Sequence, residues 1–379
     1  MSFKIVKLLK IFLQCPKLYS NNYVKESKAK MIKPKIAFID AGSFGLSYDC
    51  CFLNAIINEV DVDFFYSKTK YSFVETEKLD MRISCSDYSI SGSITSRIYG
   101  FLSYCYLLLK LFKNKNHYQY IHFNWSLIPS FDSFILPILF KKKLIYSLHN
   151  VVPHEHKFGN VIYEHQLSKK STKLILLSDY AYNISEKLNK NRFLLQHGFT
   201  LEESGYSSKM PSECFFVGNI KPYKGIENFI NLAEIRKDKE SFHIFGKWDK
   251  SLVFEKKRAK KNCQIIDDYI DDNKFRKIFS SQKAVFILPY LNISQSGILF
   301  NIIGGCQPFI GSDIGDISLF AKRIGYPQIL FKPNDLSDMD RALNFCLENH
   351  NFIKEAICKS RYKYRWKYNQ ELLRKIYCD

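Results

Sequence analysis

Short apolar runs alternate along the chain with longer segments of helical period. Runs rich in β-branched and aromatic residues occur at 35–40 (KIAFID), 62–66 (VDFFY), 119–125 (QYIHFNW), 143–148 (KLIYSL) and 173–178 (KLILLS). Residues 48–60 and 96–112 lie between them and carry apolar side chains at helical spacing. This alternation predicts strands buried on both faces and joined by helices, as in parallel βαβ units.

A second alternation follows a polar stretch at 200–213 (TLEESGYSSKMPSE), which predicts a linker. The later part contains expected strands at 214–219, 241–246, 263–267, 284–290 and 308–313, with expected helices at 225–237, 273–282 and 336–350. We therefore expect an α/β protein in which two Rossmann-like domains face each other across a cleft.

The length of 379 residues also favours two domains over one core. We expect a basic N-terminal extension at 1–32, an N-terminal domain at 33–205 and a C-terminal domain at 206–350. The remaining residues, 351–379, are expected to form a tail that packs back on the N-terminal domain.

Composition and cysteine spacing restrict the class of protein further. Hydrophobic residues make up 46% of the chain and charged residues 25%, which excludes a disordered or fibrous protein. The 11 cysteines are scattered, and no two have C-x-x-C spacing. This pattern predicts free thiols rather than a disulfide framework or a zinc knuckle.

The formal net charge of +19 is concentrated at the two ends of the chain. Residues 1–35 contain nine lysines and one glutamate, and residues 351–379 contain eight lysines or arginines and three acidic residues. A negatively charged partner is expected, which could be nucleic acid, an anionic membrane surface or a phosphorylated substrate.

Residues 3–15 (FKIVKLLKIFLQC) are too short to cross a bilayer, but their lysines fall on one stripe. This pattern is typical of a basic helix at a membrane surface. The alternative is a poorly ordered extension, because residues 31–40 (MIKPKIAFID) are typical of an ordinary protein start.

Two segments of the second half are suited to binding an anion. In 215–230 (FFVGNIKPYKGIENFI), Gly218 and Asn219 end a strand, and Lys221 and Lys224 precede a helix. Further on, the residues 294–297 (Ser294, Gln295, Ser296 and Gly297) open an apolar helix. Ammonium groups and free backbone N–H groups both bind diphosphates, although solvated lysines and a simple N-cap are the alternatives.

The stretch 146–156 (YSLHNVVPHEH) follows an expected strand, and parallel sheets bind ligands at this edge. Its histidine spacing fits no usual zinc pattern, so we expect no metal there. His149, His154 and Glu155 are cleft candidates, although His149 could also cap the strand end. The loop 40–49 (DAGSFGLSYD) is another candidate, since its Gly42, Ser43 and Gly45 allow close backbone approach.

These motifs together carry a resemblance. In order and spacing, HNVVPHE, VGNIKPYKG, HIFGKWD (243–249), IIDDYIDDNKFRKIF (265–279) and LPYLNISQSG with GGCQPFIGSDIG resemble the retaining GT-B glycosyltransferases of family 4. The likeness is to bacterial enzymes that build surface polysaccharides, and it covers residues 33–350.

The resemblance implies a nucleotide-sugar donor held by the C-terminal domain, an acceptor held by the N-terminal domain, and no metal or cofactor. A basic pair for the diphosphate maps to Lys224 with Lys221. His149 would contact the transferred sugar, and His154 and Glu155 would line the acceptor side. The implied donor-binding residues are Gly218, Asn219, Gly246, Ser294, Gln295, Ser296, Gly297 and Asn301, and Gly42, Ser43 and Gly45 would lie near the donor phosphates or the acceptor.

Two departures from the family pattern stand out. Many relatives have Arg where this chain has Asn219, so Lys221 would have to supply that charge without a bidentate guanidinium. An acidic pair common in relatives is replaced by Ile293 and Asn301 or their neighbours. The acidic run at 267–272 (DDYIDD) is expected to form a loop and an N-cap near the nucleobase rather than a metal motif.

The expected activity is retaining, metal-independent transfer of a hexose from a nucleoside-diphosphate sugar to a lipid-linked or growing glycan. We expect a cytoplasmic protein that could also contact the anionic inner face of the plasma membrane. No nucleic-acid partner is expected. Two alternatives are a GT-B-shaped protein that binds nucleotide without turnover, and a nucleic-acid-binding protein that uses the basic, tyrosine-rich tail at 359–377.

Overall fold

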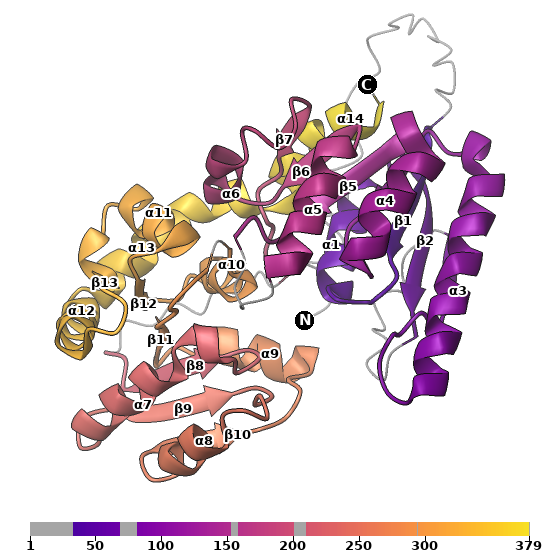
Figure 1. The fold of residues 1–379 in the computed structure, drawn as a ribbon. Coiled ribbons are helices and arrows are strands. Elements are labelled where there is room, and N and C mark those ends of the chain that lie inside the picture. The colour runs from indigo at the N-terminus through magenta and orange to yellow at the C-terminus, as the bar shows by residue number, and fades with distance from the viewer. Residues whose placement is uncertain (1–32, 69–81, 153–157, 201–209, 294, 379) are drawn as a thin grey trace, which may run out of the picture. The chain divides into compact units, whose positions relative to one another are not determined.

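Two parallel sheets organise the computed structural model, which describes residues 33–68, 82–152, 158–200, 210–293 and 295–378 (Figure 1). Residues from Pro34 onward form one unit. The expectations for residues 1–32, His154, Glu155 and Ser294 concern positions outside the described residues. The α/β class with two Rossmann-like sheets is confirmed.

The first lobe contains a seven-stranded sheet in the order β3-β2-β1-β4-β5-β6-β7, and all neighbouring strands are parallel. Its strands are β1 (Lys35–Asp40), β2 (Asp61–Ser67), β3 (Arg82–Ser86), β4 (Tyr120–Phe123), β5 (Leu144–Leu148), β6 (Lys173–Leu176) and β7 (Arg192–Leu194). Its helices are α1 (Leu46–Ile56), α3 (Ile94–Lys113), α4 (Pro129–Phe140), α5 (Phe158–Lys170) and α6 (Asp179–Ile184).

The second lobe contains a six-stranded parallel sheet in the order β10-β9-β8-β11-β12-β13. Its strands are β8 (Glu213–Val217), β9 (Ser241–Phe245), β10 (Cys263–Ile266), β11 (Ala284–Leu288), β12 (Phe309–Ser312) and β13 (Leu330–Phe331). Its helices are α7 (Ile226–Ile235), α8 (Val253–Ala259), α9 (Asp272–Phe279), α10 (Gly297–Gly304), α11 (Gly315–Arg323), α12 (Leu336–Glu348) and α13 (His350–Ser360).

The central strands are mostly apolar and buried because helices cover both faces of each sheet. Every residue of β5 and β11 is buried. The helices begin where a side chain can accept a hydrogen bond from the first turn. Ser93 caps α3, and Asp271 caps α9 by accepting a hydrogen bond from the Lys274 N–H at 2.9 Å, as predicted for the acidic run.

The end of the chain contacts both lobes. Helix α13 belongs to the core of the second lobe, whereas α14 (Gln370–Cys378) buries Leu373, Ile376 and Tyr377 against the first-lobe sheet. Between them, Trp366 donates a hydrogen bond from Nε1 to the Phe199 carbonyl at 3.2 Å. A Cβ on Gly198 would lie 2.3 Å from the Trp366 ring, so glycine is needed at this crossing.

The prediction of free thiols is wrong for two of the cysteines. Cys306 and Cys358 form a disulfide that joins the end of α10 to α13 across a sequence separation of 52 residues. No C-x-x-C or other spacing signal marks this pair, because the fold alone brings the two helices together. None of the helices in the described ranges has the length and apolar character that crossing a bilayer requires.

Candidate functional site

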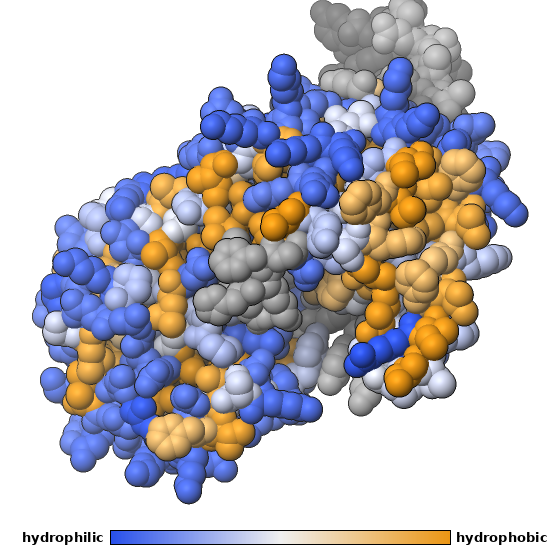
Figure 2. All heavy atoms as spheres, viewed as in Figure 1, coloured by the Kyte–Doolittle hydropathy of each residue, from blue (hydrophilic) through white to orange (hydrophobic). Residues whose placement is uncertain are grey.

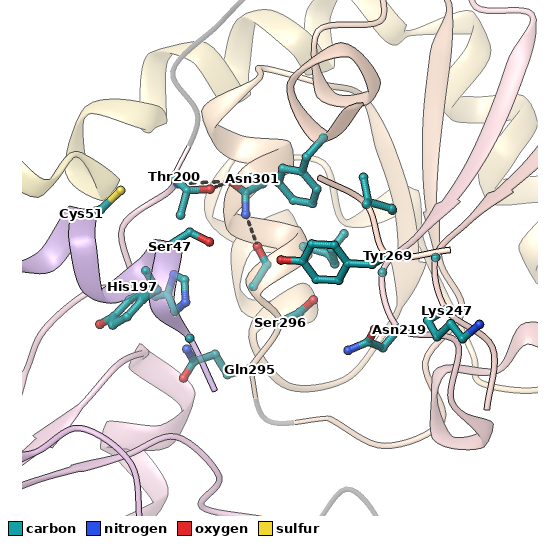
Figure 3. A pocket seen from close by; sticks show the side chains of 18 of the residues that line it. Ser47, Cys51, His197, Thr200, Asn219, Lys247, Tyr269, Gln295, Ser296 and Asn301 are labelled. Atoms are coloured by element: carbon teal, nitrogen blue, oxygen red, sulfur yellow. Dashed lines mark hydrogen bonds between the residues drawn. The ribbon is translucent and has the colours of Figure 1, made fainter. Parts of the chain in front are cut away.

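A cavity of about 520 Å³ lies where loops from the carboxyl edges of both sheets meet (Figure 3). The first lobe contributes Gly45, Ser47, Tyr48, Cys50, Cys51, Asn54, His197 and Thr200. The second lobe contributes Gly218, Asn219, Tyr223, Lys224, Gly246, Lys247, Asp268, Tyr269, Ile270, Phe275, Arg276, Ile293, Gln295, Ser296, Gly297, Ile298 and Asn301. Parallel α/β sheets bind their ligands at this edge.

Lys224 supplies a buried positive charge to the cavity. Lys224 is the last residue of the short 3₁₀ turn Pro222–Lys224, and it is only 9% exposed. The amine lies 5.6 Å from the centre of the Tyr290 ring. Burial, and then the nearby Lys221 charge, lower the pKa of Lys224 to about 8. An anionic ligand would stabilise the charged ammonium here.

Gly218 and Gly246 form a part of the cavity wall that consists of backbone alone. Their φ values are 108° and 138°, in the region that favours glycine. A Cβ on Gly246 would lie 2.0 Å from the Gly218 carbonyl oxygen, and a Cβ on Gly218 would lie 3.1 Å from the Lys224 amine. Both glycines therefore keep space open beside the lysine.

The N-terminus of α10 opens into the same cavity. Ser296 accepts a hydrogen bond from the Leu299 N–H at 3.4 Å, so it is an N-cap. A Cβ on Gly297 would meet no atom within 4 Å. Gln295 Oε1 is buried, and no residue in the described part of the chain donates to it. Backbone N–H groups at a helix start attract negative charge.

Asn301 connects α10 to the first lobe instead of pointing freely into the cavity (Figure 3). Its Oδ1 accepts hydrogen bonds from the Thr200 hydroxyl at 2.8 Å and the Thr200 N–H at 3.2 Å. Its Nδ2 donates to the Gly297 carbonyl at 2.8 Å. The side chain that stands near the family's acidic position therefore serves to join the lobes.

Lys221 is held away from the cavity lining by an ion pair. Its amine lies 2.8 Å from Asp249 Oδ2, and this contact lowers the pKa of Asp249. Asn219 lines the cavity and is exposed. The structure thus brings Asn219 and Lys224 to the cavity, whereas the Lys221 charge is offset by a carboxylate.

His149 lies behind the cavity lining. Its ring stacks on Trp125 with centroids 3.4 Å apart, and its Nε2–H donates to the Asn124 carbonyl at 2.8 Å. Burial, followed by the nearby His197, lowers the pKa of His149 well below its usual value, so the ring is neutral. Tyr48, which lines the cavity, contacts the His149 ring with ring centroids 6.0 Å apart, whereas His149 is not among the lining residues.

His197 lines the cavity, whereas His149 does not. Its ring stacks on Phe300 of α10 at 4.6 Å and contacts Tyr48 at 4.6 Å. Nδ1–H donates to the Gly198 carbonyl at 2.7 Å, which leaves Nε2 as an acceptor. Burial lowers the pKa of His197 to about 4. The ring is therefore a neutral group that touches both lobes.

Of the three candidates in the glycine loop after β1, one lines the cavity and two do not. Gly45 lines the cavity, and its N–H donates to Asp40 Oδ2 at 3.1 Å. Gly42 lies under the Phe44 ring, and Ser43 donates to the Ser67 carbonyl at 2.7 Å, so neither is among the lining residues.

Below this loop, Asp49 accepts a hydrogen bond from Asn124 Nδ2 at 2.6 Å. Burial raises the pKa of both Asp49 and Asp40, and the charge of Asp40 raises that of Asp49 further. The two carboxyl groups are buried side chains beneath the loop, and burial favours their neutral forms.

Sequence reasoning missed several lining residues. Tyr48 and Cys51 lie on α1, and Lys247 follows β9. Tyr269 precedes α9, and Arg276 lies in the second half of that helix. Lys247 and Tyr269 follow expected strands at the carboxyl edge, which is a signal that could have marked them. Tyr48 carried no such signal, because its position depends on the packing of α1.

No family model matches the chain, and no curated protein matches it either. Among solved structures, sucrose-phosphate synthase from Thermosynechococcus elongatus aligns with a TM-score of 0.68 at 15% identity, over 91% of this chain and 98% of that one. HepE of Anabaena in complex with UDP and glucose aligns at 0.66 and 13% identity, over 90% and 99%.

WaaG, a glycosyltransferase involved in lipopolysaccharide biosynthesis, aligns with a TM-score of 0.60 at 10% identity, over 91% of this chain and 99% of that one. These alignments each cover 90–91% of this chain, so they include both lobes. The chain therefore has the GT-B fold, in which these glycosyltransferases are built.

Proposed function

We propose that this protein is a retaining, metal-independent glycosyltransferase that moves a hexose from a nucleoside-diphosphate sugar to a lipid-linked or growing glycan. The observation that carries the proposal is the position of Lys224. Its buried amine shares one cavity with the N-terminus of α10 and with the wall formed by Gly218 and Gly246. A diphosphate fits this combination of a cation, backbone donors and open space.

The chemistry assigned to Lys224 is stabilisation of the leaving diphosphate. Negative charge grows on that group as the bond to the sugar breaks, and a fixed ammonium in a buried site stabilises it most. Lys221 adds a smaller contribution, because Asp249 offsets its charge at 2.8 Å. The helix start at Ser296 and Gly297 provides the second donor group.

The remaining cavity suits the other parts of the donor. Tyr269 and Ile270, with Arg276 beyond them, offer an apolar and aromatic surface for the base. On the opposite side, the Tyr48 hydroxyl is buried without a partner among the described residues. We assign Tyr48 and His197 the first contact with the transferred sugar, with His149 acting from behind Tyr48 or after a movement of that ring.

Metal-independent transfer is consistent with the groups that line the cavity. Asp268 is the one carboxylate among its described lining residues. No cluster of His, Cys, Asp or Glu that could hold a metal ion occurs in the described ranges. The charge that a metal would otherwise supply comes, in this proposal, from Lys224 and the α10 terminus.

The comparisons support the donor and acceptor classes. HepE was solved with UDP and glucose, and WaaG is involved in lipopolysaccharide biosynthesis. A nucleoside-diphosphate hexose and a membrane-linked glycan are therefore the substrates to test first. The proposed place of action is the cytoplasmic side, where nucleotide sugars are available.

The test is a comparison of Lys224→Ala with Lys221→Ala. UDP- and GDP-sugars are first screened by thermal shift, since a bound ligand raises the melting temperature. Turnover of the best donor is then measured. Lys224→Ala should lower kcat by on the order of 10²-fold or more, because it removes transition-state charge stabilisation.

Lys221→Ala should lower kcat much less, since its charge is already paired. Unchanged kcat in Lys224→Ala would refute the role of this lysine. Binding of a nucleotide sugar to the wild-type chain without any transfer or hydrolysis would instead favour the nucleotide-binding alternative.

A further inference from the structure

Helix α3 has large apolar side chains on its outward face as well as on its buried face. It buries Gly100, Tyr104, Leu107, Leu108 and Leu111 against the first lobe. Its outward face carries Ile94, Ile98, Tyr99, Leu102, Tyr106 and Leu109, which are 55–76% exposed. A surface helix normally has charged residues on that side, so this face is suited to a partner.

The apolar surface continues onto the neighbouring helix. The Phe101 and Phe131 rings contact each other at 5.6 Å and join α3 to α4. Phe134 and Ile138 of α4 are more than half exposed. Figure 2 shows hydrophobic side chains running over both helices. We name this surface, formed by the six α3 residues above with Phe134 and Ile138, the α3–α4 face.

The segment that forms the α3–α4 face is rich in basic residues, although the exposed Asp87 precedes it. Residues 88–154 contain seven basic residues, Arg97, Lys110, Lys113, Lys115, Lys141, Lys142 and Lys143. The single acidic residue in this range is Asp132, which is fully buried and accepts a hydrogen bond from the Tyr104 hydroxyl at 2.9 Å. The exposed part of this segment is therefore apolar and cationic.

The lysines gather at one end of the two helices. Lys110 and Lys113 are in the last turn of α3, and Lys141 and Lys142 follow α4. The two ends meet, because Lys143 donates a hydrogen bond from its amine to the Lys115 carbonyl at 2.9 Å. Long lysine side chains beside an apolar surface can extend to phosphate groups while their stems stay on hydrocarbon.

We propose that the α3–α4 face docks on a lipid bilayer that contains anionic headgroups. The apolar side chains would enter the boundary between headgroups and acyl chains, and the lysines would contact lipid phosphates. A second copy of the chain would bring like charges together. A nucleic acid would leave the isoleucine and leucine side chains without a partner. The proposal does not depend on the catalytic assignment.

Helix α3 would lie flat on the membrane instead of crossing it. Its buried face is fixed to the first lobe by Tyr104 and the three leucines, so only the opposite face can enter lipid. The N-terminal end of α3 follows β3 and lies at the carboxyl edge of the sheet, where the cavity opens. A docked face would thus place the cavity edge near the membrane surface.

The test is flotation of the full chain with phosphatidylcholine vesicles, with and without phosphatidylglycerol. We expect retention on the anionic vesicles. The triple variant Ile98→Ser, Leu102→Ser and Leu109→Ser should weaken binding by roughly tenfold or more. It removes three apolar side chains that would enter the lipid, and it leaves the charge unchanged. The matched control is Val253→Ser, Phe254→Ser and Phe352→Ser, whose side chains are 63–72% exposed on the second lobe.

A second variant set tests the charge contribution. Lys113→Gln, Lys141→Gln and Lys142→Gln should weaken binding to anionic vesicles by on the order of fivefold per lysine, and should reduce its salt dependence. The control is Lys237→Gln, Lys239→Gln and Lys261→Gln on the second lobe, which removes the same charge elsewhere.

Melting temperatures check that each variant is folded. If the serine triple on the α3–α4 face unfolds, the double variant Tyr99→Ser with Tyr106→Ser replaces it.

Four outcomes would overturn the proposal. The wild-type chain could fail to float with anionic vesicles. The serine triple on the α3–α4 face could float as well as its control. Deletion of residues 1–32 could abolish binding while the serine triple leaves it intact, which would assign the contact to that segment. Dimerisation that the serine triple abolishes, without vesicle binding, would assign the face to a second copy.

Discussion

At the scale of single residues, Lys224 is the group whose chemistry depends most on its surroundings. Burial and the nearby Lys221 lower its pKa to about 8, whereas an exposed lysine titrates more than two units higher. In the proposed role, the charged form of Lys224 would bind the diphosphate and the neutral form would not. The protonation state of this side chain would then control donor binding just above neutral pH.

Nucleotide affinity should consequently fall as pH rises through the Lys224 pKa. Below about pH 7 the free protein already carries the charge, and above about pH 8 binding must take up a proton, so the dissociation constant should increase by up to tenfold per pH unit. Isothermal titration calorimetry of UDP or GDP between about pH 7 and about pH 9.5 measures both the affinity and the proton uptake.

Lys224→Arg is the control for this pH dependence, because a guanidinium stays charged throughout the range. Its affinity should change little with pH even if the absolute value is lower. An equally flat profile in the wild-type chain would contradict the assignment of Lys224 to the diphosphate.

Residue identity could be predicted from sequence where a short motif carries it, and not where contact comes from tertiary packing. Lys224, Gly218 and Gly297 stand at strand ends or helix starts that their own segment specifies, and all three line the cavity. His149 belongs to such a motif too, but it is not among the residues that line the cavity. His197 follows an expected strand, which is a local signal, but the stacking of its ring on Phe300 of the other lobe depends on tertiary packing.

At the scale of elements, α10 is fixed at two points. Asn301, in the middle of the helix, is joined to the first lobe by its contacts with Thr200, and the helix end is joined to α13 by the disulfide between Cys306 and Cys358. A helix whose N-terminus binds an anion benefits from such fixing, since its N–H groups then need little reorganisation when charge develops.

The disulfide should make stability depend on redox conditions. A cross-link that closes a loop of this length removes unfolded-chain entropy worth about 4 kcal/mol. Cys358→Ser should therefore lower the free energy of unfolding by that order in oxidising buffer and have little effect in dithiothreitol. Chemical denaturation under both conditions measures it. Cys85→Ser, which changes an exposed free thiol, is the control, and equal stability of the oxidised and reduced wild-type chain would contradict the prediction.

Elements could be predicted where their hydrophobic pattern is long and regular. The strand at 35–40 has the same bounds in the sequence prediction and in β1. The exposed edge strand β3 (RISCS) and the two-residue β13 have too few apolar residues to be recognised. Helix α4 was not predicted, because its apolar run contains Pro137, which interrupts a helical pattern.

At the scale of the whole molecule, the C-terminal segment completes the core of the first lobe. Tyr377 is fully buried, and its hydroxyl lies 2.6 Å from His122 Nδ1. Burial lowers the pKa of His122 to about 3, so the imidazole is neutral in this contact. The Lys173 amine donates to the Ile376 carbonyl at 2.5 Å. The first lobe is therefore built from both ends of the described chain.

Tyr377→Ala should lower the free energy of unfolding by about 3–5 kcal/mol, because it leaves a cavity and deprives His122 of its partner. Tyr377→Phe should cost about 1 kcal/mol, since it removes only the hydroxyl. Lys375→Ala on the exposed face of the same helix should stay within about 0.5 kcal/mol of wild type. Urea denaturation distinguishes the three, and a Tyr377→Ala protein as stable as Lys375→Ala would show that α14 does not support the first lobe.

Residues 196–199, at the end of the first lobe, contact residues 366–369, which come after α13. Asn369 donates to the Gln196 carbonyl at 3.1 Å, and a Cβ on Gly198 would lie 2.3 Å from the Trp366 ring. Sliding of one lobe against the other would separate the indole from its glycine and break the Asn369 hydrogen bond. A movement of the lobes that keeps both contacts would therefore have to pivot about this point.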